Sequence, residues 1–424
     1  MAHRERVLLL HNRYRAAGGE ERVVDELEAL LRARGHAVAR CERDSGATGR
    51  VTAARALLRG GVDEQAVARA VAAHRADVLH AHNVHPLFGW RALAAGRAAG
   101  ARVVLHLHNY RFTCAIGVAY RDRRPCHSCH GRDTRPGLRH RCRGSLPEAA
   151  VYAAALSAQQ PRLLETVDRF VAVGEAQAEV LARFGLPRER VDVVPNAVAE
   201  VAGASRAGEG AYALASGRLV EEKGFATAVE AARRAGVPLR IAGEGPDEGR
   251  LRELATGADV TFLGRLDGEA MAAARRGAAV VLVPSRWEEA CPMAAVEALA
   301  DGVPVLASDL GGLPELVGAE ASLPVGDGAA WASALAALWA DPALRARRGA
   351  EALERARARH TPEAQYAALT GAYAAAERAA RGRGDAGEGE GARGAAVAAD
   401  EGAGGAADEG AAGGAAGADG GRGG

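Results

Sequence analysis

Short apolar runs alternate with amphipathic helical stretches along most of this chain, and the alternation occurs twice. The first unit shows the pattern clearly. Arg6 to Leu10 is typical of a buried strand, Gly18-Gly19 of a turn, and Glu20 to Arg34 of a helix that ends at Gly35. Strands that alternate with helices predict parallel sheets covered by helices on both faces. The expected fold class is therefore α/β, with two doubly wound, Rossmann-like domains.

Further strands are expected in both halves of the chain. In the first half they fall at Asp77 to His80, Arg102 to His106, Arg169 to Val173 and Val191 to Val194. In the second half they fall at Tyr212 to Ser216, Pro238 to Ala242, Val260 to Phe262, Ala279 to Val283 and Val303 to Ala307. Helices are predicted between these strands, and also at Ala329 to Trp339 and Pro342 to Ala379.

A chain of 424 residues is too long for one hydrophobic core, and its pattern predicts five segments. These are a first domain, 1–198, with a Cys-rich insertion, 109–145; a linker, 199–210; a second domain, 211–360; a helix, 361–380, that returns to the first domain; and a tail, 381–424. The linker lacks periodicity. The tail has Val397 as its only larger apolar residue, so burial cannot offset its ordering entropy and we expect it to be disordered.

Charge and hydropathy exclude some partners and locations. The formal net charge is +1, which argues against nucleic acid as the main partner. No apolar run reaches the roughly 18 to 20 residues that cross a bilayer, and Val7 to Leu10 is shorter than the apolar core of a signal peptide. The expected location is the cytoplasm, with a peripheral contact at the inner face of the membrane left open.

Two motifs in the second half carry charged groups between a strand and a helix. Gly217-Arg218 precedes Lys223-Gly224, and Lys223 is the only lysine of the chain. Cations and free backbone N–H groups at a helix N-terminus suit a phosphate, and a diphosphate could be held there without a metal. Further on, Glu289 and Glu297 border the carboxyl end of another predicted strand, where carboxylates can accept hydrogen bonds from sugar hydroxyls. Taken alone, each motif also fits an ordinary solvated turn or helix.

The order of these motifs resembles the family 4 glycosyltransferases of the GT-B fold, over roughly residues 5–360. The residues that carry the resemblance are Gly18-Gly19, His108, Pro195-Asn196, Gly217-Arg218, Lys223-Gly224, Gly243-Glu244-Gly245-Pro246, Glu289 with Glu297, and Gly311-Gly312-Leu313-Pro314-Glu315. Two features depart from the pattern. Ala197 stands where the family often has Gly, and Ala290-Cys291-Pro292 follows Glu289 in place of the commoner Phe-Gly. Both departures leave the charged groups in place.

The resemblance implies a retaining glycosyltransferase whose two domains face each other across a cleft. It gives the donor diphosphate to Arg218 and Lys223, the donor sugar to Glu289 and His108, and the ribose to Glu297. His106 is the rival of His108. The remaining donor-binding set that it implies is Gly18, Gly19, Asn196, Gly217, Gly243, Gly245 and Arg265.

The chemistry that the resemblance implies needs no cofactor besides the nucleotide-sugar donor. Positive groups would stabilise the leaving diphosphate, and a donor phosphate oxygen would take the acceptor proton, so no protein nucleophile is named. The acceptor would be a glycan, a polyprenyl-phosphate-linked molecule or a small molecule. The alternatives are a non-catalytic nucleotide-sugar-binding scaffold and another GT-B enzyme such as a sugar-nucleotide epimerase.

The insertion after His108 contains four cysteines at loop spacings. Cys114, Cys126, Cys129 and Cys142 include one close Cys-x2-Cys pair, which is compatible with a structural zinc site. Free thiols and disulfides are the alternatives. The insertion also carries eight arginines between Arg121 and Arg143, and these fit either an anionic acceptor or membrane surface, or a solvated loop in an arginine-rich chain.

Overall fold

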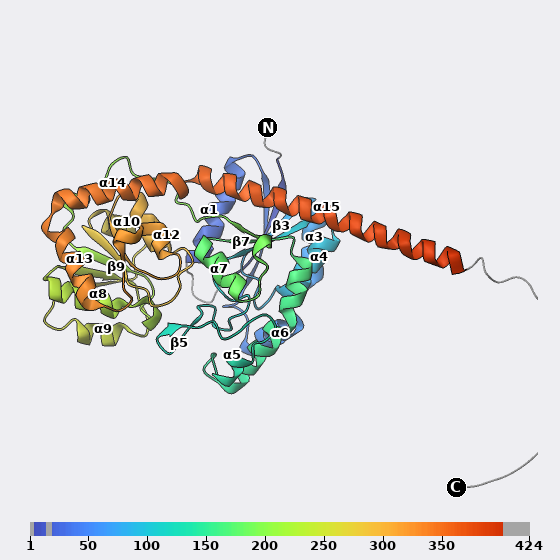
Figure 1. Cartoon of the computed structure of the whole chain (residues 1–424), viewed down its shortest axis with the longest axis horizontal. Helices are drawn as coiled ribbons and strands as arrows, with labels where there is room; N and C mark the ends of the chain where they lie inside the picture. Colours follow the sequence, from blue (N-terminus) through green and yellow to red (C-terminus); the bar gives the residue numbers. More distant parts are fainter. Residues whose placement is uncertain (1–3, 14–18, 402–424) are drawn as a thin grey trace, which may run out of the picture. The chain divides into compact units, whose positions relative to one another are not determined.

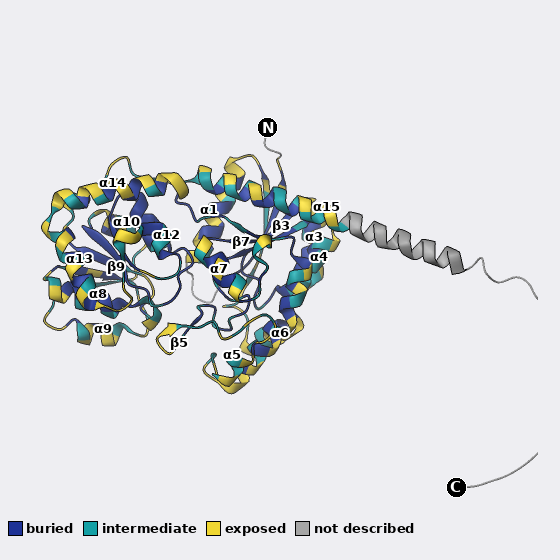
Figure 2. Cartoon of the chain, viewed as in Figure 1, coloured by how far each residue is buried: buried dark blue, intermediate teal, exposed yellow. Residues whose placement is uncertain are grey.

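The computed structural model describes residues 4–13 and 19–401, with side chains as far as Arg383. The described residues up to Glu377 belong to one compact unit, which contains two parallel six-stranded sheets (Figure 1). Buried residues concentrate on the strands and on the helix faces that cover them (Figure 2). The expected architecture of two doubly wound domains is confirmed.

The first sheet has the strand order β2-β1-β3-β4-β7-β8. Its strands are β1 (Arg6–Arg13), β2 (Ala37–Asp44), β3 (Val78–Ala81), β4 (Arg102–Leu107), β7 (Arg169–Ala172) and β8 (Val191–Val193). The short antiparallel pair β5 (Tyr120–Arg121) and β6 (Arg124–Pro125) lies in the insertion. The helices are α1 (Gly19–Ala33), α2 (Arg50–Arg59), α3 (Glu64–His74), α4 (Gly89–Ala98), α5 (Arg135–Arg139), α6 (Leu146–Thr166), α7 (Glu175–Arg183) and the short 3-10 helix η1 (Arg188–Arg190).

The second sheet has the strand order β11-β10-β9-β12-β13-β14. Its strands are β9 (Ala213–Ser216), β10 (Leu239–Ala242), β11 (Val260–Gly264), β12 (Val280–Val283), β13 (Val305–Ser308) and β14 (Ser322–Leu323). Its helices are α8 (Phe225–Ala235), α9 (Glu248–Leu254), α10 (Gly268–Arg276), α11 (Met293–Ala300), α12 (Leu313–Val317), α13 (Gly328–Ala340) and α14 (Pro342–Arg359), and its 3-10 helices are η2 (Ala207–Glu209), η3 (Glu221–Lys223) and η4 (Ala319–Ala321).

Each sheet reverses its strand order at one point, and that point locates a crevice. In the second sheet the reversal lies between β9 and β12, and in the first between β1 and β3. Loops that leave adjacent strands in opposite directions open a crevice at the carboxyl ends of those strands, where ligands of such sheets bind. Gly217 to Lys223 follows β9 and Pro284 to Glu289 follows β12, so the two charged motifs of the second half meet at its reversal point.

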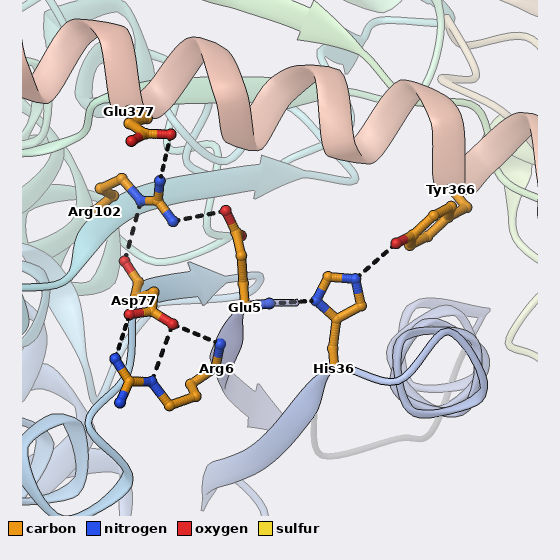
Figure 3. A network of polar contacts seen from close by, with 7 residues as sticks. All are labelled: Glu5, Arg6, His36, Asp77, Arg102, Tyr366 and Glu377. Carbon is orange, nitrogen blue, oxygen red and sulfur yellow. Dashed lines mark hydrogen bonds and ion pairs between the residues drawn. The ribbon is translucent and has the colours of Figure 1, made fainter. Parts of the chain in front are cut away.

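A C-terminal helix, α15 (Pro362–Glu401), returns to the first domain as expected (Figure 1). Leu369, Tyr373 and Ala376 pack on the sheet face that carries Val7 and Leu9. Polar contacts flank this packing: Tyr366 hydrogen-bonds to His36, and Glu377 pairs with Arg102, which also contacts Glu5 (Figure 3). The helix therefore docks through one apolar stripe with a polar contact at each end.

The end of this helix differs from the sequence prediction. A helix of residues 361–380 and a disordered tail from 381 are expected, whereas α15 continues to Glu401. Residues 381–401 consist mostly of Ala, Glu, Asp, Arg and Gly. Of these residue types, only Gly strongly disfavours a helix. The remainder of the predicted tail, 402–424, lies outside the described residues.

Candidate functional site

The loop after β9 places both predicted phosphate-binding cations. Gly217 follows the strand, Arg218 comes next with its side chain 65% exposed, and Lys223 ends η3 just before α8. Arg218 lies 3.7 Å from Glu222 of the same loop. An exposed ion pair at this distance is weak, so the Arg218 guanidinium is available to an anionic ligand.

Two glycines of the next βα turn shape this loop. A Cβ atom at Gly243 would lie 1.9 Å from the carbonyl oxygen of Gly217, and one at Gly245 would lie 2.2 Å from that of Leu219. Only glycine allows so close a backbone approach. The Leu219 N–H donates to the Glu244 carbonyl at 2.9 Å, which fixes the two turns together. Packing therefore accounts for Gly243 and Gly245, and their predicted contact with a donor stays a prediction.

Lys223 and Glu289 meet where β9 and β12 end. The Lys223 Nζ atom lies 2.6 Å from Glu289 Oε1, and the Ser285 hydroxyl donates to the same oxygen at 2.6 Å. Glu289 is buried, and Lys223 also lies 5.6 Å from the centre of the Trp287 ring. A buried carboxylate needs such partners, since desolvation otherwise disfavours its charge. The pair joins the two predicted groups that the sequence placed 66 positions apart.

Glu297 of α11 is held by two arginines. Its Oε1 atom lies 2.5 Å from Arg22 Nη1, and its Oε2 atom lies 2.6 Å from Arg275 Nη1. Arg275 also pairs with Asp301 at 2.8 Å. Arg22 belongs to α1 of the first domain, so this carboxylate is a point of contact between the two domains.

The remaining predicted donor-binding residues fall in different surroundings. Asn196 is buried and donates to the Cys291 carbonyl at 3.1 Å, so it holds the loop after Glu289. Arg265 follows β11 and its side chain is exposed. A Cβ atom at Gly19 would lie 3.7 Å from Met293 of α11, so the start of α1 approaches the second domain. Gly18 lies outside the described residues.

His108 stands at the end of a stack of histidines. Its Nε2 atom lies 2.9 Å from Nδ1 of His82, and its ring stacks on His106 with centroids 4.4 Å apart. Burial lowers the pKa of His108 well below its usual range, and the neighbouring His106 adds to the shift. His108 is therefore neutral at physiological pH, and His106 lies beside it as a neighbour in the same stack.

Polar contacts join the Cys-rich insertion to the second domain. His127 Nε2 lies 2.5 Å from Glu288 Oε2, and the Tyr110 hydroxyl donates to the Glu288 carbonyl at 2.9 Å. Arg123 pairs with Glu221 of the phosphate-binding loop at 3.1 Å. Glu288 precedes Glu289, so the insertion bears directly on the loop that carries the predicted sugar-binding carboxylate.

The four cysteines of the insertion are free thiols that lie near one another. Burial raises the pKa of Cys129 to about 11 and that of Cys114 as well, with smaller contributions from the neighbouring thiols. Backbone N–H groups of residues 116, 117 and 119 point at the Cys114 sulfur and act in the opposite direction. Within the described part of the chain, the cysteine sulfurs do not form a group of three or more within 4.8 Å of one another. The four thiols are still neighbours in space as well as in sequence, and the predicted zinc site stays a prediction.

Sequence reasoning missed five residues of this region, which are Arg22, Arg275, Ser285, Glu288 and His127. Arg22 lies three positions after Gly19, in the first turn of a helix whose start was already singled out. His127 lies inside the Cys-x2-Cys pair, where a metal-centred interpretation hid its contact with Glu288. The partners of Arg275 depend on the packing of α10 against α11, for which the sequence carries no local signal.

Comparison with known families covers both halves of the chain. Residues 17–200 match the family described as Glycosyltransferase Family 4, and residues 201–355 match the family described as Glycosyl transferases group 1. Within the described residues, no helix combines the length and apolarity required of a membrane span.

Curated relatives match over parts of the chain. A phosphatidyl-myo-inositol mannosyltransferase of Mycobacterium leprae is 42% identical over 28% of this chain and 34% of its own length. A D-inositol 3-phosphate glycosyltransferase of Pseudarthrobacter chlorophenolicus is 34% identical over 46% of this chain and 53% of its own length. A 2-deoxystreptamine N-acetyl-D-glucosaminyltransferase of Streptomyces fradiae is 28% identical over 66% of this chain and 70% of its own length. The matches thus span about a third to a half of the first two relatives.

Solved structures show the same fold at low sequence identity. A sucrose-phosphate synthase from Thermosynechococcus elongatus superposes with a TM-score of 0.63 at 21% identity, over 86% of this chain and 97% of its own. Anabaena HepE in complex with UDP and glucose superposes with a TM-score of 0.57 at 17% identity, over 86% of this chain and 99% of its own. The expected GT-B fold is confirmed.

Proposed function

The chain belongs to family 4 of the glycosyltransferases, and from this premise we propose that it transfers a sugar, with retention of configuration, from a nucleotide-diphosphate sugar to a hydroxyl group of an acceptor. The acceptor is a glycan, a lipid-linked molecule or a small molecule. The proposal rests on the charged residues at the strand reversal of the second sheet. It assigns the donor to the second domain and the acceptor to the first.

The observation that carries the proposal is the pairing of Lys223 with Glu289 at the strand reversal of the second sheet. Lys223 and Glu289 lie 2.6 Å apart at this position, so a cation that suits a diphosphate stands beside a carboxylate that suits sugar hydroxyls. The diphosphate would take Lys223 and the exposed Arg218, and the sugar hydroxyls would take Glu289. A bound donor would then separate Lys223 from Glu289. Its diphosphate would contact Lys223, and its sugar would contact Glu289.

Charge development explains how these residues would promote transfer. As the sugar–phosphate bond breaks, negative charge grows on the leaving diphosphate, and preorganised cations stabilise that charge most where water is excluded. Lys223 lies beside Glu289 and the Trp287 ring, so its ammonium group is already at this site before a donor binds. The N-terminus of α8 follows directly after Gly224 and adds backbone N–H groups of favourable polarity.

The first domain would supply the face on which the acceptor arrives. His108 is neutral, so it can donate or accept a hydrogen bond at the donor sugar without adding a charge beside the anomeric carbon. A donor phosphate oxygen would take the acceptor proton, and the sugar would pass to the acceptor oxygen on the face that the diphosphate leaves.

The insertion supplies a second element of the proposal. His127 and Arg123 contact the loops that hold Glu289 and Lys223, so the insertion would keep both loops in their binding geometry. We further propose that a structural zinc held by Cys114, Cys126, Cys129 and Cys142 stiffens this segment. Backbone N–H groups aimed at the Cys114 sulfur offset part of the rise that burial causes in its pKa, and they could donate to the thiolate, which is the form that binds zinc.

Two observations favour an anionic acceptor. Six of the eight arginines of the insertion, Arg123, Arg124, Arg132, Arg135, Arg139 and Arg141, are exposed. Two relatives are named for phosphatidyl-myo-inositol and D-inositol 3-phosphate, both of which carry phosphate. An arginine-rich surface attracts such groups, and Arg binds phosphate through two parallel hydrogen bonds. The proposed acceptor therefore carries a phosphate or another acid close to its reacting hydroxyl.

The test is a panel of nucleotide sugars, first by thermal shift and then by transfer. A true donor at 100 times its dissociation constant adds about 2.7 kcal/mol to the free energy of unfolding. The donor that stabilises the chain should then be consumed when a phosphorylated acceptor is added, with the α or β configuration of the product matching that of the donor. Stabilisation without any consumption across acceptors would favour the non-catalytic scaffold instead.

A further inference from the structure

Five histidines gather on one face of the first sheet, near its carboxyl-terminal edge. His11 lies on β1, His80 on β3 and His106 on β4, while His82 and His108 follow β3 and β4. Residues two apart on a strand point to the same face, which explains the pairing of His80 with His82 and of His106 with His108. The His80 and His82 rings stack with centroids 4.5 Å apart, and those of His82 and His106 at 5.2 Å.

Four of these side chains are buried with nitrogens that lack a partner, namely His11 and the three histidines that lie closest together. His80, His82 and His106 are at most 2% exposed. Within the described residues, Nε2 of His80, Nε2 of His82 and both ring nitrogens of His106 make no hydrogen bond. Buried polar atoms are almost always satisfied, so several such atoms in one place call for a ligand.

The three imidazoles are also close enough to share that ligand. Each of His80, His82 and His106 can offer one ring nitrogen such that the three nitrogens lie within 4.8 Å of one another, and no other set of three or more His, Cys, Asp or Glu side chains in the described part of the chain does so. We propose that His80, His82 and His106 bind one divalent metal ion of the class that imidazole prefers, with Zn²⁺ as the representative.

Outer hydrogen bonds support this assignment. Metal-binding histidines usually have their second ring nitrogen fixed by a neighbouring group. His80 Nδ1 lies 2.8 Å from the Tyr373 hydroxyl, and His82 Nδ1 lies 2.9 Å from His108 Nε2. In both residues the nitrogen left over is the unpartnered one. Tyr366 and Glu377 anchor α15 (Figure 3). Tyr373 lies between these two residues on the same helix and is therefore held in place as well.

The surroundings have room for the ion or for a water molecule bound to it. A cavity of about 30 Å³ is lined by His82, His106 and His108 among others. A water molecule needs roughly 10 to 15 Å³ of such space. Three protein ligands leave a fourth position, which water could fill from this cavity.

Metal binding would also set the proton positions along the stack. With Nε2 of His82 on the ion, the proton of His82 stays on Nδ1 and is donated to Nε2 of His108. The neutral His108 ring then carries its own proton on Nδ1, where it can donate to a ligand. This consequence for His108 rests on the proposed function, whereas binding of the ion does not.

Zinc uptake by the full-length chain tests the site, with the cysteines removed as a competing source. A variant with Cys126→Ser and Cys129→Ser, stripped of metal and dialysed against Zn²⁺, should retain one equivalent of zinc by elemental analysis. X-ray absorption should show Zn–N distances of about 2.0 to 2.1 Å and none of about 2.3 Å, the Zn–S value. Adding His106→Gln should abolish this zinc. His36→Gln, which alters another buried histidine near α15, should keep it.

Tyr373→Phe provides a second variant that removes no ligand and leaves the apolar ring in place. Loss of the outer hydrogen bond to His80 should weaken zinc affinity by about 10- to 100-fold. The proposal is overturned if the double serine variant holds no zinc, if folded His106→Gln protein keeps its zinc, or if Tyr373→Phe binds zinc as tightly as the parent. Each outcome is read from metal binding alone, so a failed sugar-transfer assay would count against the proposed function only.

Discussion

Arg22 of the first domain donates to Glu297 of the second, with 2.5 Å between the guanidinium and the carboxylate. Arg275 contacts the other oxygen of Glu297, so each oxygen of this carboxylate has an arginine partner. Glu297 is the residue proposed to hold the donor ribose. Because Arg22 is the more exposed of the two partners, it is the one with which a ribose at Glu297 would compete.

Replacing Arg22 by glutamine should tighten donor binding. The Arg22 side chain is 50% exposed, and an ion pair with such a partner contributes about 0.2 to 1 kcal/mol. Its removal from the competition should lower the Kd of the donor by about 1.5- to 5-fold in calorimetric titrations. Arg32→Gln, on the same helix but paired with Glu28, is the control and should leave the Kd unchanged. Weaker binding by Arg22→Gln would show that Arg22 assists the donor.

His127→Ala should impair transfer although His127 lies in the insertion. The change removes the contact with Glu288 and loosens the loop that carries Glu289. A hydrogen bond to a charged group contributes about 1.5 kcal/mol or more, so kcat/KM should fall about tenfold. His140→Ala alters a histidine of the same segment and serves as the control in steady-state assays. Equal losses of kcat/KM in both variants would mean that each change acts by disturbing the fold of the insertion, and that the contact with Glu288 has no separate effect.

Acidification should destabilise the protein between pH 6.5 and pH 4. Burial lowers the pKa of His85 to about 4, with Arg111 adding to the shift, whereas an unfolded histidine titrates near 6.5. The unfolded state therefore binds the additional proton in this interval, and the free energy of unfolding falls as pH falls, by up to about 1.4 kcal/mol per pH unit for this group. Urea unfolding of His85→Leu should show a shallower pH dependence than the parent. Leu87→Ala, a nearby core change without a titrating group, should lower the free energy of unfolding and leave its pH dependence as steep as in the parent.

Shortening the chain to residues 1–383 should leave stability and donor binding unchanged. The removed segment, 384–424, consists of Gly, Ala, Asp, Glu and Arg apart from Val397, and it offers little apolar surface to bury. The core contacts of α15 involve Leu369 to Ala376. A drop of several degrees in Tm on removal would show that the segment packs against the rest of the protein.

Local patterns predict most of this fold. Strands that are buried on both faces, such as β3 and β4, appear as apolar runs, and their predicted limits fall within one or two residues of those observed. The strand β2 escapes prediction because it lies at a sheet edge, is partly exposed and carries Arg40, Glu42 and Arg43 in place of an apolar run. The break between α14 and α15 follows from Pro362, since the residue before a proline is disfavoured in a helix.

The candidate site is predictable in its strand-end motifs and much less so in its long-range contacts. Lys223 and Glu289 can be found because each follows a predicted strand and precedes a predicted helix. The contact of Arg22 with Glu297, 275 positions apart, depends on how two domains meet, and the sequence gives no local sign of it. The histidine stack shows the same limit, because the period-two spacing of His80 with His82 and of His106 with His108 is visible, but the strand register that brings them together is not.

The transfer rate of Lys223→Ala tests the central claim most directly. Lys223 is proposed to stabilise the leaving diphosphate without a catalytic metal, so its removal should lower kcat by about 10² to 10³, as for the loss of one preorganised stabilising group. The parent enzyme should keep its rate when magnesium and manganese are chelated. Arg234→Ala, at the far end of α8, is the control, and circular dichroism should show all variants folded. A folded Lys223→Ala enzyme that turns over at the parent rate would contradict the account.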